Sequence, residues 1–412
     1  MVYYSRHKRN PWAFLHMKLN TITKLKKLEG RRVLLRVDFN IPISASGRIG
    51  AGADGRLKAA LPTIAHLQAA GAKVIAVSHL GRPKRRNAKD SLKPIVRHLG
   101  RLVGQKVHFI DADLNKPDLA EKQLARMGNG HLALVENIRF YSQEEENDPK
   151  FAKRLAELAD LYVNDAFGTC HRAHASTVGV TKHLPSYAGF LVENEVKNLS
   201  RLLEKPKKPF VVLMGGAKIS SKLPTLKNLL KVADTVMLGG GMANAFFKAR
   251  GCSIGKSKVS PEDVKFVKQH LKDKKLLFPT DVLCASSVSD KARVRYAEGS
   301  ECGKNDYLVD AGPETIRAYA EKIKQAKTLI WNGPVGVFEI KKFSHGTMAL
   351  GRLVAARSKG KAFGVVGGGE TVMALERTGM AEWVDHVSTG GGAMLEFLSG
   401  KPLPGIKPLM KK

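Results

Sequence analysis

A buried strand that runs directly into glycine residues is expected four times in the second half of the chain. These strands are Phe210–Met214, Thr235–Leu238, Thr328–Trp331 and Ala362–Val366. After the last of them, Gly367–Gly369 lead into a helical pattern over Val372–Arg377. Glycine lets the backbone approach a ligand, and the first N–H groups of a helix have no partner within that helix. The pattern therefore predicts an anion site, suited above all to phosphate, at one edge of a sheet.

The first half of the chain alternates expected strands with expected helices. The strands are Arg32–Val37, Lys73–Val77, His131–Val135 and Leu161–Val163, and the helices are Arg56–Ala70 and Pro149–Ala159. Alternation of this kind favours a parallel sheet with helices on both faces. The predicted fold class is α/β, with two Rossmann-like, doubly wound domains whose sheets are mainly parallel.

A long helix is expected between the two halves, over Leu184–Lys205, and the basic, proline-marked segment Lys205–Pro209 ends it. We interpret this helix as a linker with a hinge at its ends. The predicted division of the chain is an extra N-terminal arm over residues 1–18, an N-terminal domain over 19–185, an interdomain helix over 186–205, a C-terminal domain over 206–387, and a C-terminal segment over 388–412 that packs back on the N-terminal domain.

Polar residues follow the first-half strands, at what becomes the carboxyl edge of the sheet. They are Asp38, Asn40, Arg56, His79, Arg82, Arg139, His171 and Arg172. Open α/β sheets bind ligands at this edge, and arginine matches the geometry of phosphate and carboxylate groups. The four arginines therefore predict a ligand with several negative charges. His171 and His174 have the spacing of a possible metal pair, but without a third ligand nearby a phosphate- or carboxylate-facing role is preferred.

The chain is strongly basic, since its 412 residues include 69 Lys and Arg against 37 Asp and Glu, a net charge of +32. The basic residues are spread along the chain without the interleaved aromatic residues of RNA-binding surfaces. We interpret the chain as a generally basic cytosolic protein that binds polyanions weakly and in a salt-sensitive way. Its four widely spaced cysteines form no CxxC pair, which favours a reducing compartment and indicates neither a zinc site nor a disulfide framework.

No apolar run approaches the ~20 residues that a membrane-spanning helix needs. The basic and aromatic start of the chain lacks the apolar core and the cleavage site of a signal peptide. An ordered arm, a disordered tail and a native start at Met17 are all compatible with this stretch.

Eight motifs in this order resemble those of the phosphoglycerate kinase family. They are RVDFNIP (36–42), SHLGRP (78–83), ENIRF (136–140), DAFGTCHRAH (165–174), GGAKISSK (215–222), WNGPVGVFE (331–339), VVGGGET (365–371) and STGGGAMLEFLSGK (388–401). The resemblance covers the chain from Leu19 to Lys407. It implies a cytosolic, monomeric glycolytic enzyme that bends at a hinge and transfers a phosphoryl group reversibly between 1,3-bisphosphoglycerate and Mg-ADP.

The resemblance also implies two sets of binding residues. In the N-terminal domain, 3-phosphoglycerate or 1,3-bisphosphoglycerate would contact Asp38, Phe39, Asn40, Arg56, His79, Leu80, Gly81, Arg82, Arg139 and Arg172. In the C-terminal domain, ADP or ATP would contact Gly216, Lys218, Lys222, Gly239, Gly240, Gly241, Gly312, Asn332, Pro334, Glu339, Gly368, Gly369, Glu370 and Thr371. The expected cofactor is Mg²⁺, with Glu370 as its protein ligand.

Direct phosphoryl transfer needs positioning and charge stabilisation rather than a nucleophilic side chain. We expect Arg56, Lys218 and the helix start at Gly368 and Gly369 to stabilise the transferring group. Two departures from the family pattern bear on the metal. The family usually has Asp where this chain has Glu370, and many members have Asp where this chain has Ser221.

Three other interpretations of the sequence are less favoured. A nicotinamide-dependent dehydrogenase would need a dinucleotide fingerprint early in one domain, and none is found. The segment Gly251–Ser257 resembles a phosphate-binding loop of the Walker type, but its glycines are too close and it follows a helical stretch. A basic, nucleic-acid-binding relative without kinase activity is suggested only by the net charge. No specific nucleic acid and no membrane is therefore expected as a partner.

Overall fold

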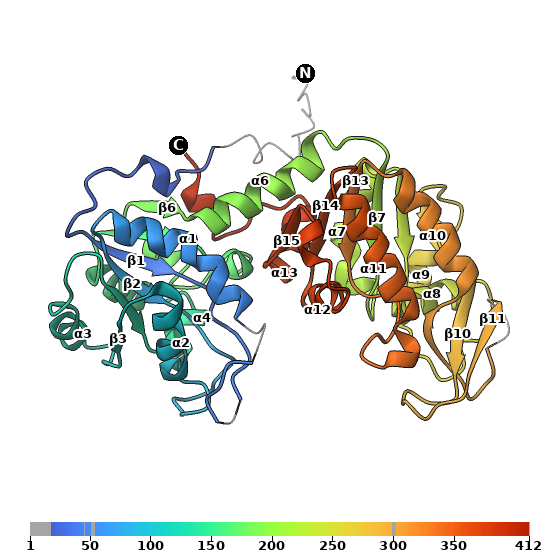
Figure 1. Cartoon of the computed structure of the whole chain (residues 1–412), viewed down its shortest axis with the longest axis horizontal. Helices are drawn as coiled ribbons and strands as arrows, with labels where there is room; N and C mark the ends of the chain where they lie inside the picture. The colour runs from blue at the N-terminus through green and yellow to red at the C-terminus, as the bar shows by residue number, and fades with distance from the viewer. Residues whose placement is uncertain (1–17, 45, 51–53, 299–301, 412) are drawn as a thin grey trace, which may run out of the picture. The chain divides into compact units, whose positions relative to one another are not determined.

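The structure, a computed structural model, describes residues 18–411 except 45, 51–53 and 299–301. All but Lys18 of the predicted N-terminal arm lies outside the described residues. The chain divides into two compact units, labelled by element in Figure 1. Unit 1 comprises the described residues up to Lys197 and from Pro402 on, and unit 2 comprises Asn198–Lys401.

Unit 1 contains one sheet of six parallel strands in the order β3-β4-β2-β1-β5-β6. The strands are β1 (Arg32–Arg36), β2 (Lys73–Val77), β3 (Val107–Ile110), β4 (Leu132–Val135), β5 (Leu161–Asn164) and β6 (Ser186–Ala188). Most of their residues are buried apolar side chains, as expected of parallel strands covered on both faces. The predicted strands of this half are confirmed, with ends that differ by one residue at most.

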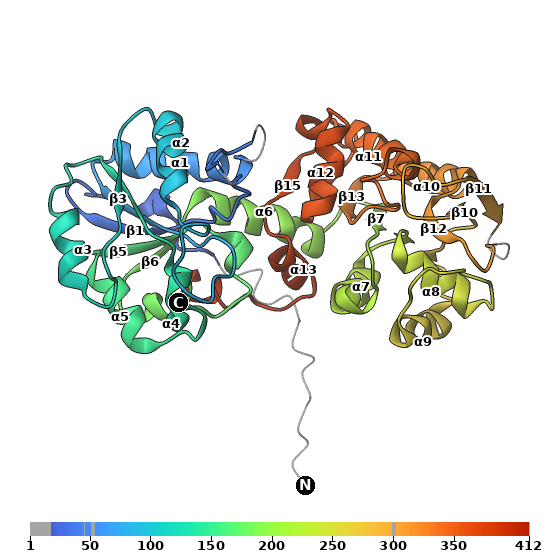
Figure 2. The same cartoon turned by 90° about the horizontal axis from the view of Figure 1, so that it is seen from below.

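Helices cover both faces of the unit 1 sheet (Figure 2). They are α1 (Gly55–Ala69), α2 (Lys93–Val103), α3 (Pro117–Leu124), α4 (Ser142–Glu145) and α5 (Pro149–Glu157), with short 3-10 helices at Ile22–Lys24, Ile138–Phe140, Phe167–Thr169, Gly179–Lys182 and Lys407–Leu409. Helices α1 and α2 lie on one face, and α3 and α5 lie on the other. Leu35 of β1, Ile64 of α1 and Leu99 of α2 share one buried apolar cluster, which fixes the first helix after β1 against the sheet.

The helix predicted over Leu184–Lys205 begins later than expected, and its first turn is wrong. The structure has the edge strand β6 at Ser186–Ala188, and α6 runs from Phe190 to Glu204. Pro185 carries no N–H, and Gly189 ends the strand where its N–H donates to the carbonyl oxygen of Asn164 at 2.9 Å. Tyr187 pairs with Val163 of the neighbouring strand, so sheet pairing overrides the helical pattern.

The last residues of the chain belong to unit 1. Leu19 and Met410 form an antiparallel bridge, and the N–H of Asn20 donates to the carbonyl oxygen of Leu409 at 2.8 Å. The N–H of Gly405 donates to the carbonyl oxygen of Cys170 at the same distance. These bonds join the two ends of the described chain within one unit.

Unit 2 contains a second six-stranded parallel sheet in the order β15-β14-β13-β7-β8-β9. Its strands are β7 (Phe210–Met214), β8 (Thr235–Leu238), β9 (Leu276–Leu277), β13 (Thr328–Asn332), β14 (Phe363–Gly367) and β15 (His386–Ser388). All four predicted strand-then-glycine repeats are therefore confirmed as strands of one sheet. Because these strands are parallel, the glycines that follow them lie along the same edge.

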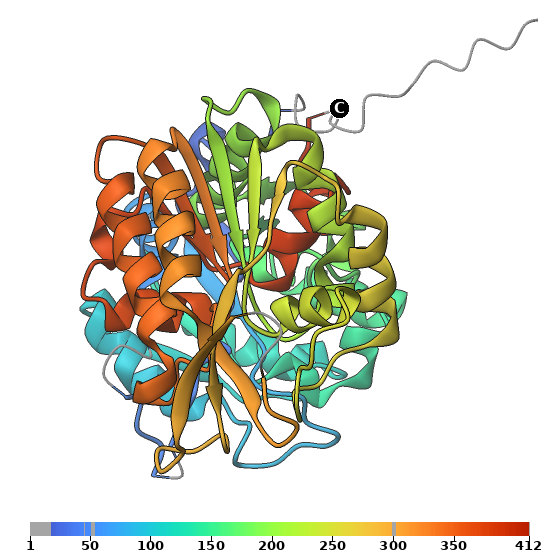
Figure 3. The same ribbon diagram turned by 90° about the vertical axis from the view of Figure 1, so that its right-hand side faces the viewer.

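The unit 2 sheet also has helices on both faces, seen edge-on in Figure 3 between orange helices on one side and yellow-green helices on the other. The helices are α7 (Leu223–Val232), α8 (Gly241–Ala249), α9 (Pro261–His270), α10 (Pro313–Gln325), α11 (His345–Ser358), α12 (Gly369–Arg377) and α13 (Gly392–Leu398), with 3-10 turns at Ser220–Lys222, Lys341–Phe343 and Ala381–Trp383. In the described part of the chain, no helix is long and apolar enough to cross a membrane.

A small antiparallel sheet accompanies the large one in unit 2, in the order β11-β10-β12. Its strands are β10 (Asp281–Ala285), β11 (Val294–Glu298) and β12 (Tyr307–Ala311). No sequence pattern predicted this sheet. Leu283 and Val309 pack with Phe343 in a separate buried cluster, so the small sheet has its own core.

Candidate active site

The loop after β1 and the start of α1 place a carboxylate and a guanidinium together in unit 1. Nη1 of Arg56 donates to Oδ2 of Asp38 at 3.0 Å and to the carbonyl oxygen of Asn40 at 3.1 Å. The Phe39 N–H donates to the hydroxyl of Ser78 at 2.8 Å, which ties this loop to the end of β2. The Arg56 guanidinium is therefore held by two acceptors yet stays partly exposed.

The loops after β2 and β4 bring a second guanidinium to the same edge. The Gly81 N–H donates to Oδ1 of Asn40 at 3.0 Å, and Nη1 of Arg139 donates to the carbonyl oxygen of Gly81 at 2.7 Å. Leu80 is bonded through both its N–H and its carbonyl oxygen to the side-chain amide of Asn137. Hydrogen bonds thus link predicted substrate residues from three separate strand ends.

A buried arginine that the sequence analysis did not select lies behind this cluster. Arg36, at the end of β1, is fully buried, and its Nη2 lies 3.2 Å from Nδ1 of His79. Nδ1 of His79 also lies 3.9 Å from Oδ1 of Asp38. Burial lowers the pKa of His79 well below its usual range, and the positive charges of Arg36 and Arg139 lower it further. His79 is therefore neutral at neutral pH.

Glu144 places a buried carboxyl group in this region. Its carboxylate accepts from the hydroxyl of Ser176 at 2.6 Å and from the Ser176 N–H at 2.9 Å, and Nε of Arg36 donates to the same hydroxyl at 2.8 Å. Burial raises the pKa of Glu144, and the charge of Arg36 opposes that rise. The sequence signal for this network was an arginine inside an otherwise apolar strand.

The remaining predicted residues of unit 1 lie at different depths. Arg172 is half-buried, and its Nε lies 3.2 Å from Nε2 of His171. His174 is buried, and burial together with the charge of Arg139 lowers its pKa to about 4. Arg82 is exposed and makes no side-chain hydrogen bond within the described chain. Across residues 18–411, outside the gaps named above, no three His, Cys, Asp or Glu side chains are grouped as metal ligands.

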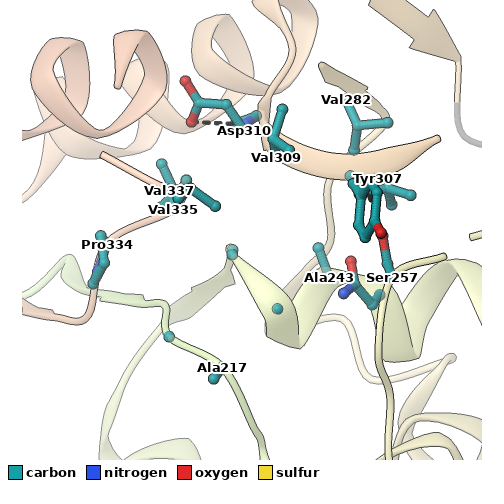
Figure 4. A pocket seen from close by; sticks show the side chains of 18 of the residues that line it. Ala217, Ala243, Ser257, Val282, Tyr307, Val309, Asp310, Pro334, Val335 and Val337 are labelled. Carbon is teal, nitrogen blue, oxygen red and sulfur yellow. Dashed lines mark hydrogen bonds between the residues drawn. The ribbon is translucent and has the colours of Figure 1, made fainter. Parts of the chain in front are cut away.

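Unit 2 has a pocket of about 340 Å³ on the glycine-rich edge of its large sheet. Figure 4 shows Tyr307, Val309 and Val282 of the small sheet on one side of it, with Ala217, Ala243 and Ser257 on another. Pro334, Val335 and Val337 come from the loop after β13. We call this space the glycine-lined pocket. Its apolar walls and backbone polar groups are typical of a small-molecule site.

Half of the predicted nucleotide residues line the glycine-lined pocket. These are Gly216, Gly239, Gly240, Gly241, Pro334, Glu339 and Glu370. The others lie beside it or further away: Lys218, Lys222, Gly312, Asn332, Gly368, Gly369 and Thr371. Gly312 is the N-cap residue just before α10, and its N–H donates to the main-chain carbonyl oxygen of Asp281, while its neighbour Ala311 lines the pocket.

Lys222 is held by main-chain oxygens at this edge. Its Nζ donates to the carbonyl oxygen of Gly215 at 2.7 Å and to that of Asn332 at 3.3 Å. Burial lowers the pKa of Lys222 to about 8, while the nearby carboxylate of Glu370 opposes the shift. Lys218 is exposed, and its side chain forms no hydrogen bond or ion pair with the described residues.

The turn before α12 requires a glycine at position 368. Gly368 has φ +99, and a Cβ placed there would approach Nδ2 of Asn332 to 3.0 Å. Nδ2 of Asn332 donates to the carbonyl oxygen of Gly367 at 2.6 Å, and the Thr371 hydroxyl accepts from the N–H of Gly333 at 2.7 Å. The loops after β13 and β14 are thereby joined, and the exposed Gly369 and Glu370 start the helix.

Residues that sequence reasoning missed shape both ends of the site in unit 2. Asp263 of α9 accepts from the N–H groups of Ile219 and Ser220, at 3.2 and 2.7 Å, and so holds the loop that carries Lys218 and Lys222. Ser257, Val282, Val288 and Tyr307 line the pocket from the small sheet and the loops near it. Ser257 ends the segment Gly251–Ser257, which was rejected as a Walker-type loop. No glycine motif marks Val282, Val288 and Tyr307, so only the unpredicted small sheet could have revealed them.

Comparisons with known proteins identify the family and the fold of the chain. The phosphoglycerate kinase family model matches residues 22–401. The chain is 46% identical over 392 residues to a phosphoglycerate kinase of Moorella thermoacetica, covering 94% of this chain and 98% of that protein. It is 45% identical over 388 residues to a cytosolic phosphoglycerate kinase of Triticum aestivum, covering 93% and 96%. The solved phosphoglycerate kinase of Coxiella burnetii superimposes with a TM-score of 0.82 at 40% identity, covering 95% of this chain and 99% of the other. The chain belongs to the phosphoglycerate kinase family.

Proposed function

We propose that this protein catalyses reversible transfer of a phosphoryl group between 1,3-bisphosphoglycerate and ADP, giving 3-phosphoglycerate and ATP in glycolysis and gluconeogenesis. Membership of the family over residues 22–401 is the observation that carries the proposal. The two chemically different sites support it, since one gathers arginines and the other is a glycine-lined pocket. The comparisons do not support a nucleic-acid-binding relative without kinase activity.

In unit 1, the phosphoglycerate is proposed to lie against Arg56, Arg139 and Arg172. The bond of Arg56 to Asp38 fixes part of its guanidinium while the partly exposed remainder can reach an anion. Neutral His79 can donate or accept one hydrogen bond without adding a charge. The exposed Arg82 and the backbone of Gly81 extend the anion site along the same strand ends.

In unit 2, the nucleotide base is proposed to fill the apolar part of the glycine-lined pocket. Glu339 is assigned to the ribose, and the phosphates are assigned to Lys218, Lys222 and the start of α12. A helix start offers free N–H groups and a partial positive charge to phosphate. Arg56, Lys218 and the backbone of Gly368 and Gly369 are assigned to the charge that develops on the transferring group.

The donor chemistry of Glu370 fits a magnesium ion. Mg²⁺ keeps several waters and is usually bound by one or two carboxylates together with substrate phosphates. Glu370 presents an exposed carboxylate at the pocket and at the start of α12. When bound, Mg²⁺ supplies neutralisation of phosphate charge, and Glu370 would hold it.

Transfer is proposed to occur directly between the two substrates, without a covalent enzyme intermediate. Catalysis then depends on orientation and on positive charge around a nearly metaphosphate-like group. Water must be excluded because it would hydrolyse the acyl phosphate. The proposal therefore includes closure of the two units about the ends of α6 during each turnover. A cytosolic location is proposed as well, supported by the cytosolic relative from Triticum aestivum, and a monomeric state is proposed from the family resemblance alone.

A coupled assay tests the proposal. Purified protein is mixed with 3-phosphoglycerate, ATP and Mg²⁺, and added glyceraldehyde-phosphate dehydrogenase reduces the product with NADH. We expect NADH loss that requires protein, Mg²⁺ and both substrates. A folded protein, verified by circular dichroism, that gives no NADH loss would overturn the proposal.

A further inference from the structure

A hollow lined by basic residues lies at the amino edge of the unit 2 sheet, where four adjacent strands begin. Its volume is about 690 Å³, and we call it the basic hollow. It is lined by Arg201, Lys207, Lys208, Lys327, Gly360, Lys361, Ala362, Phe363 and Asp385. Lys207 and Lys208 belong to the segment between α6 and β7, which is drawn in green in Figure 1. Sites of this size, within the usual range of ~300–1,000 Å³, hold small molecules.

The charges around the basic hollow are unbalanced. Five cationic side chains face one carboxylate, that of Asp385, which accepts from the N–H of Gly364 at 2.8 Å. Lys208 is paired with Asp234 at 3.2 Å. Within the described chain, Lys207, Lys327 and Lys361 form no ion pair. Like charges held together raise the local potential and attract an anion.

One cation of the basic hollow is held in position by packing. Arg201 lies in the last part of α6, and its guanidinium carbon is 3.8 Å from the centre of the Phe363 ring. Stacking on a ring fixes the plane of the guanidinium while its N–H groups stay free to bind oxygen atoms. The hollow thus combines one oriented arginine with several exposed lysines, which is donor chemistry suited to phosphate.

The proposed catalytic chemistry does not use this place. Lys208, Lys327 and Lys361 lie just before β7, β13 and β14, whereas the glycine-lined pocket lies after the same strands. A five-residue strand spans ~16 Å, so a nucleotide phosphate at the carboxyl edge does not reach the hollow. The basic hollow is therefore separate from the proposed active site within unit 2.

We propose that the basic hollow is a second anion site, which binds a small polyanion with two or more adjacent phosphate groups. A single phosphate would leave most of the positive charge uncompensated, whereas linked phosphates could contact Arg201, Lys327 and Lys361 together. The ligand chemistry is that of a linear oligophosphate, either free or as the phosphate chain of a nucleotide. The proposal stands whether or not the kinase activity is found.

Glycine resonances give a local readout, because Gly360 lines the hollow and the Gly364 N–H is bonded to Asp385. Protein labelled with [15N]glycine is titrated with inorganic triphosphate, without Mg²⁺, in about 150 mM KCl so that distant surface charges are screened. A second titration uses ATP. We expect the amide resonances of Gly360 and Gly364 to shift and to reach saturation. The shifts of both glycines should give the same dissociation constant for a given ligand.

The test variant is K207Q/K327Q/K361Q, which removes three exposed lysines from the hollow. The matched control is K265Q/K268Q/K272Q, which removes three exposed lysines from α9 and the turn after it and so keeps the same net charge. Loss of three surface contacts predicts that the test variant binds triphosphate about tenfold more weakly than the unsubstituted protein. The control variant should bind triphosphate as tightly as the unsubstituted protein.

Three outcomes would overturn the proposal. Gly360 and Gly364 could stay unshifted while Gly368 and Gly369 shift, which would leave only the proposed nucleotide site. Both triple variants could weaken binding equally, which would indicate general electrostatics rather than a site. A duplex oligonucleotide could bind the hollow at least as well as any oligophosphate of equal phosphate concentration, which would indicate an extended nucleic-acid surface.

Discussion

Nζ of Lys222 donates to the carbonyl oxygen of Gly215 at 2.7 Å, in a place where burial lowers the pKa of this lysine to about 8. A half-buried ammonium that donates to neutral carbonyl groups lacks a full counter-charge. An anion arriving beside it would supply that charge and raise the pKa again. Lys222 is thus positioned to bind phosphate while its ammonium group is protonated. It loses the positive charge, and with it this attraction, on deprotonation.

We predict that nucleotide binding weakens as the pH rises through about 8. The sign follows from linkage, since the protonated lysine binds phosphate better and its proton is lost above its pKa. Isothermal titration of ADP between pH 7 and pH 9.5 measures the effect. In Lys222→Arg the side chain keeps its charge, so its affinity should be nearly independent of pH over this range. Equal pH profiles for the two proteins would contradict the assignment.

Arg56→Ala is predicted to lower turnover by about 100-fold or more, with a much smaller effect on the KM for 3-phosphoglycerate. The reason is that Arg56 is assigned to negative charge that develops during transfer. Arg139 and Arg172 still bind 3-phosphoglycerate before transfer begins. Lys218→Ala should behave in the same way toward ATP. Steady-state kinetics in the coupled assay measures both. Near-normal turnover in both variants would show that the transferring group is stabilised elsewhere.

Glu370→Asp is predicted to remain active, because a shorter carboxylate at the start of α12 still suits Mg²⁺ and its waters. Glu370→Gln should instead raise the Mg²⁺ concentration needed for half-maximal rate by roughly tenfold, since a charged ligand is lost. Magnesium titrations of the coupled assay compare the two variants. An inactive, folded Glu370→Asp protein would indicate that the loop is adapted to the longer side chain.

Sequence patterns predicted eight of the twelve strands of the two large sheets, because those strands are buried runs with glycines or polar residues at the ends, and they missed β3, β6, β9 and β15. The segments Lys73–Val77, Phe210–Met214 and Thr235–Leu238 have the predicted bounds. Local patterns failed at Ser186–Ala188, where pairing with β5 decides the conformation. They also missed the small antiparallel sheet, whose exposed strand β11 has only one buried residue and so lacks a clear apolar pattern.

The candidate site was predicted unevenly for a physical reason. Residues that follow a strand or begin a helix, such as Lys222 and Arg56, are marked by their place in the chain. Asp263 and Glu144 lie on helices and act through bonds to distant loops, so no local motif marks them. Arg36 lies in an apolar strand. Its part in a buried polar network is apparent only from its hydrogen bond to Ser176, whose hydroxyl also binds Glu144.

Glu144→Gln is predicted to destabilise the protein by about 3 kcal/mol, because removing one member of a buried charged network leaves the other uncompensated. Here the remaining charge is that of Arg36, which is fully buried and shares the Ser176 hydroxyl with Glu144. Urea unfolding at pH 7, followed by circular dichroism, measures the change. The neighbouring Glu145→Gln is the matched control, since Glu145 is half exposed in its 3.3 Å ion pair with Arg139 and such pairs contribute under ~1 kcal/mol. Equal, small losses in both variants would show that Glu144 is already protonated in the folded protein and does not balance Arg36.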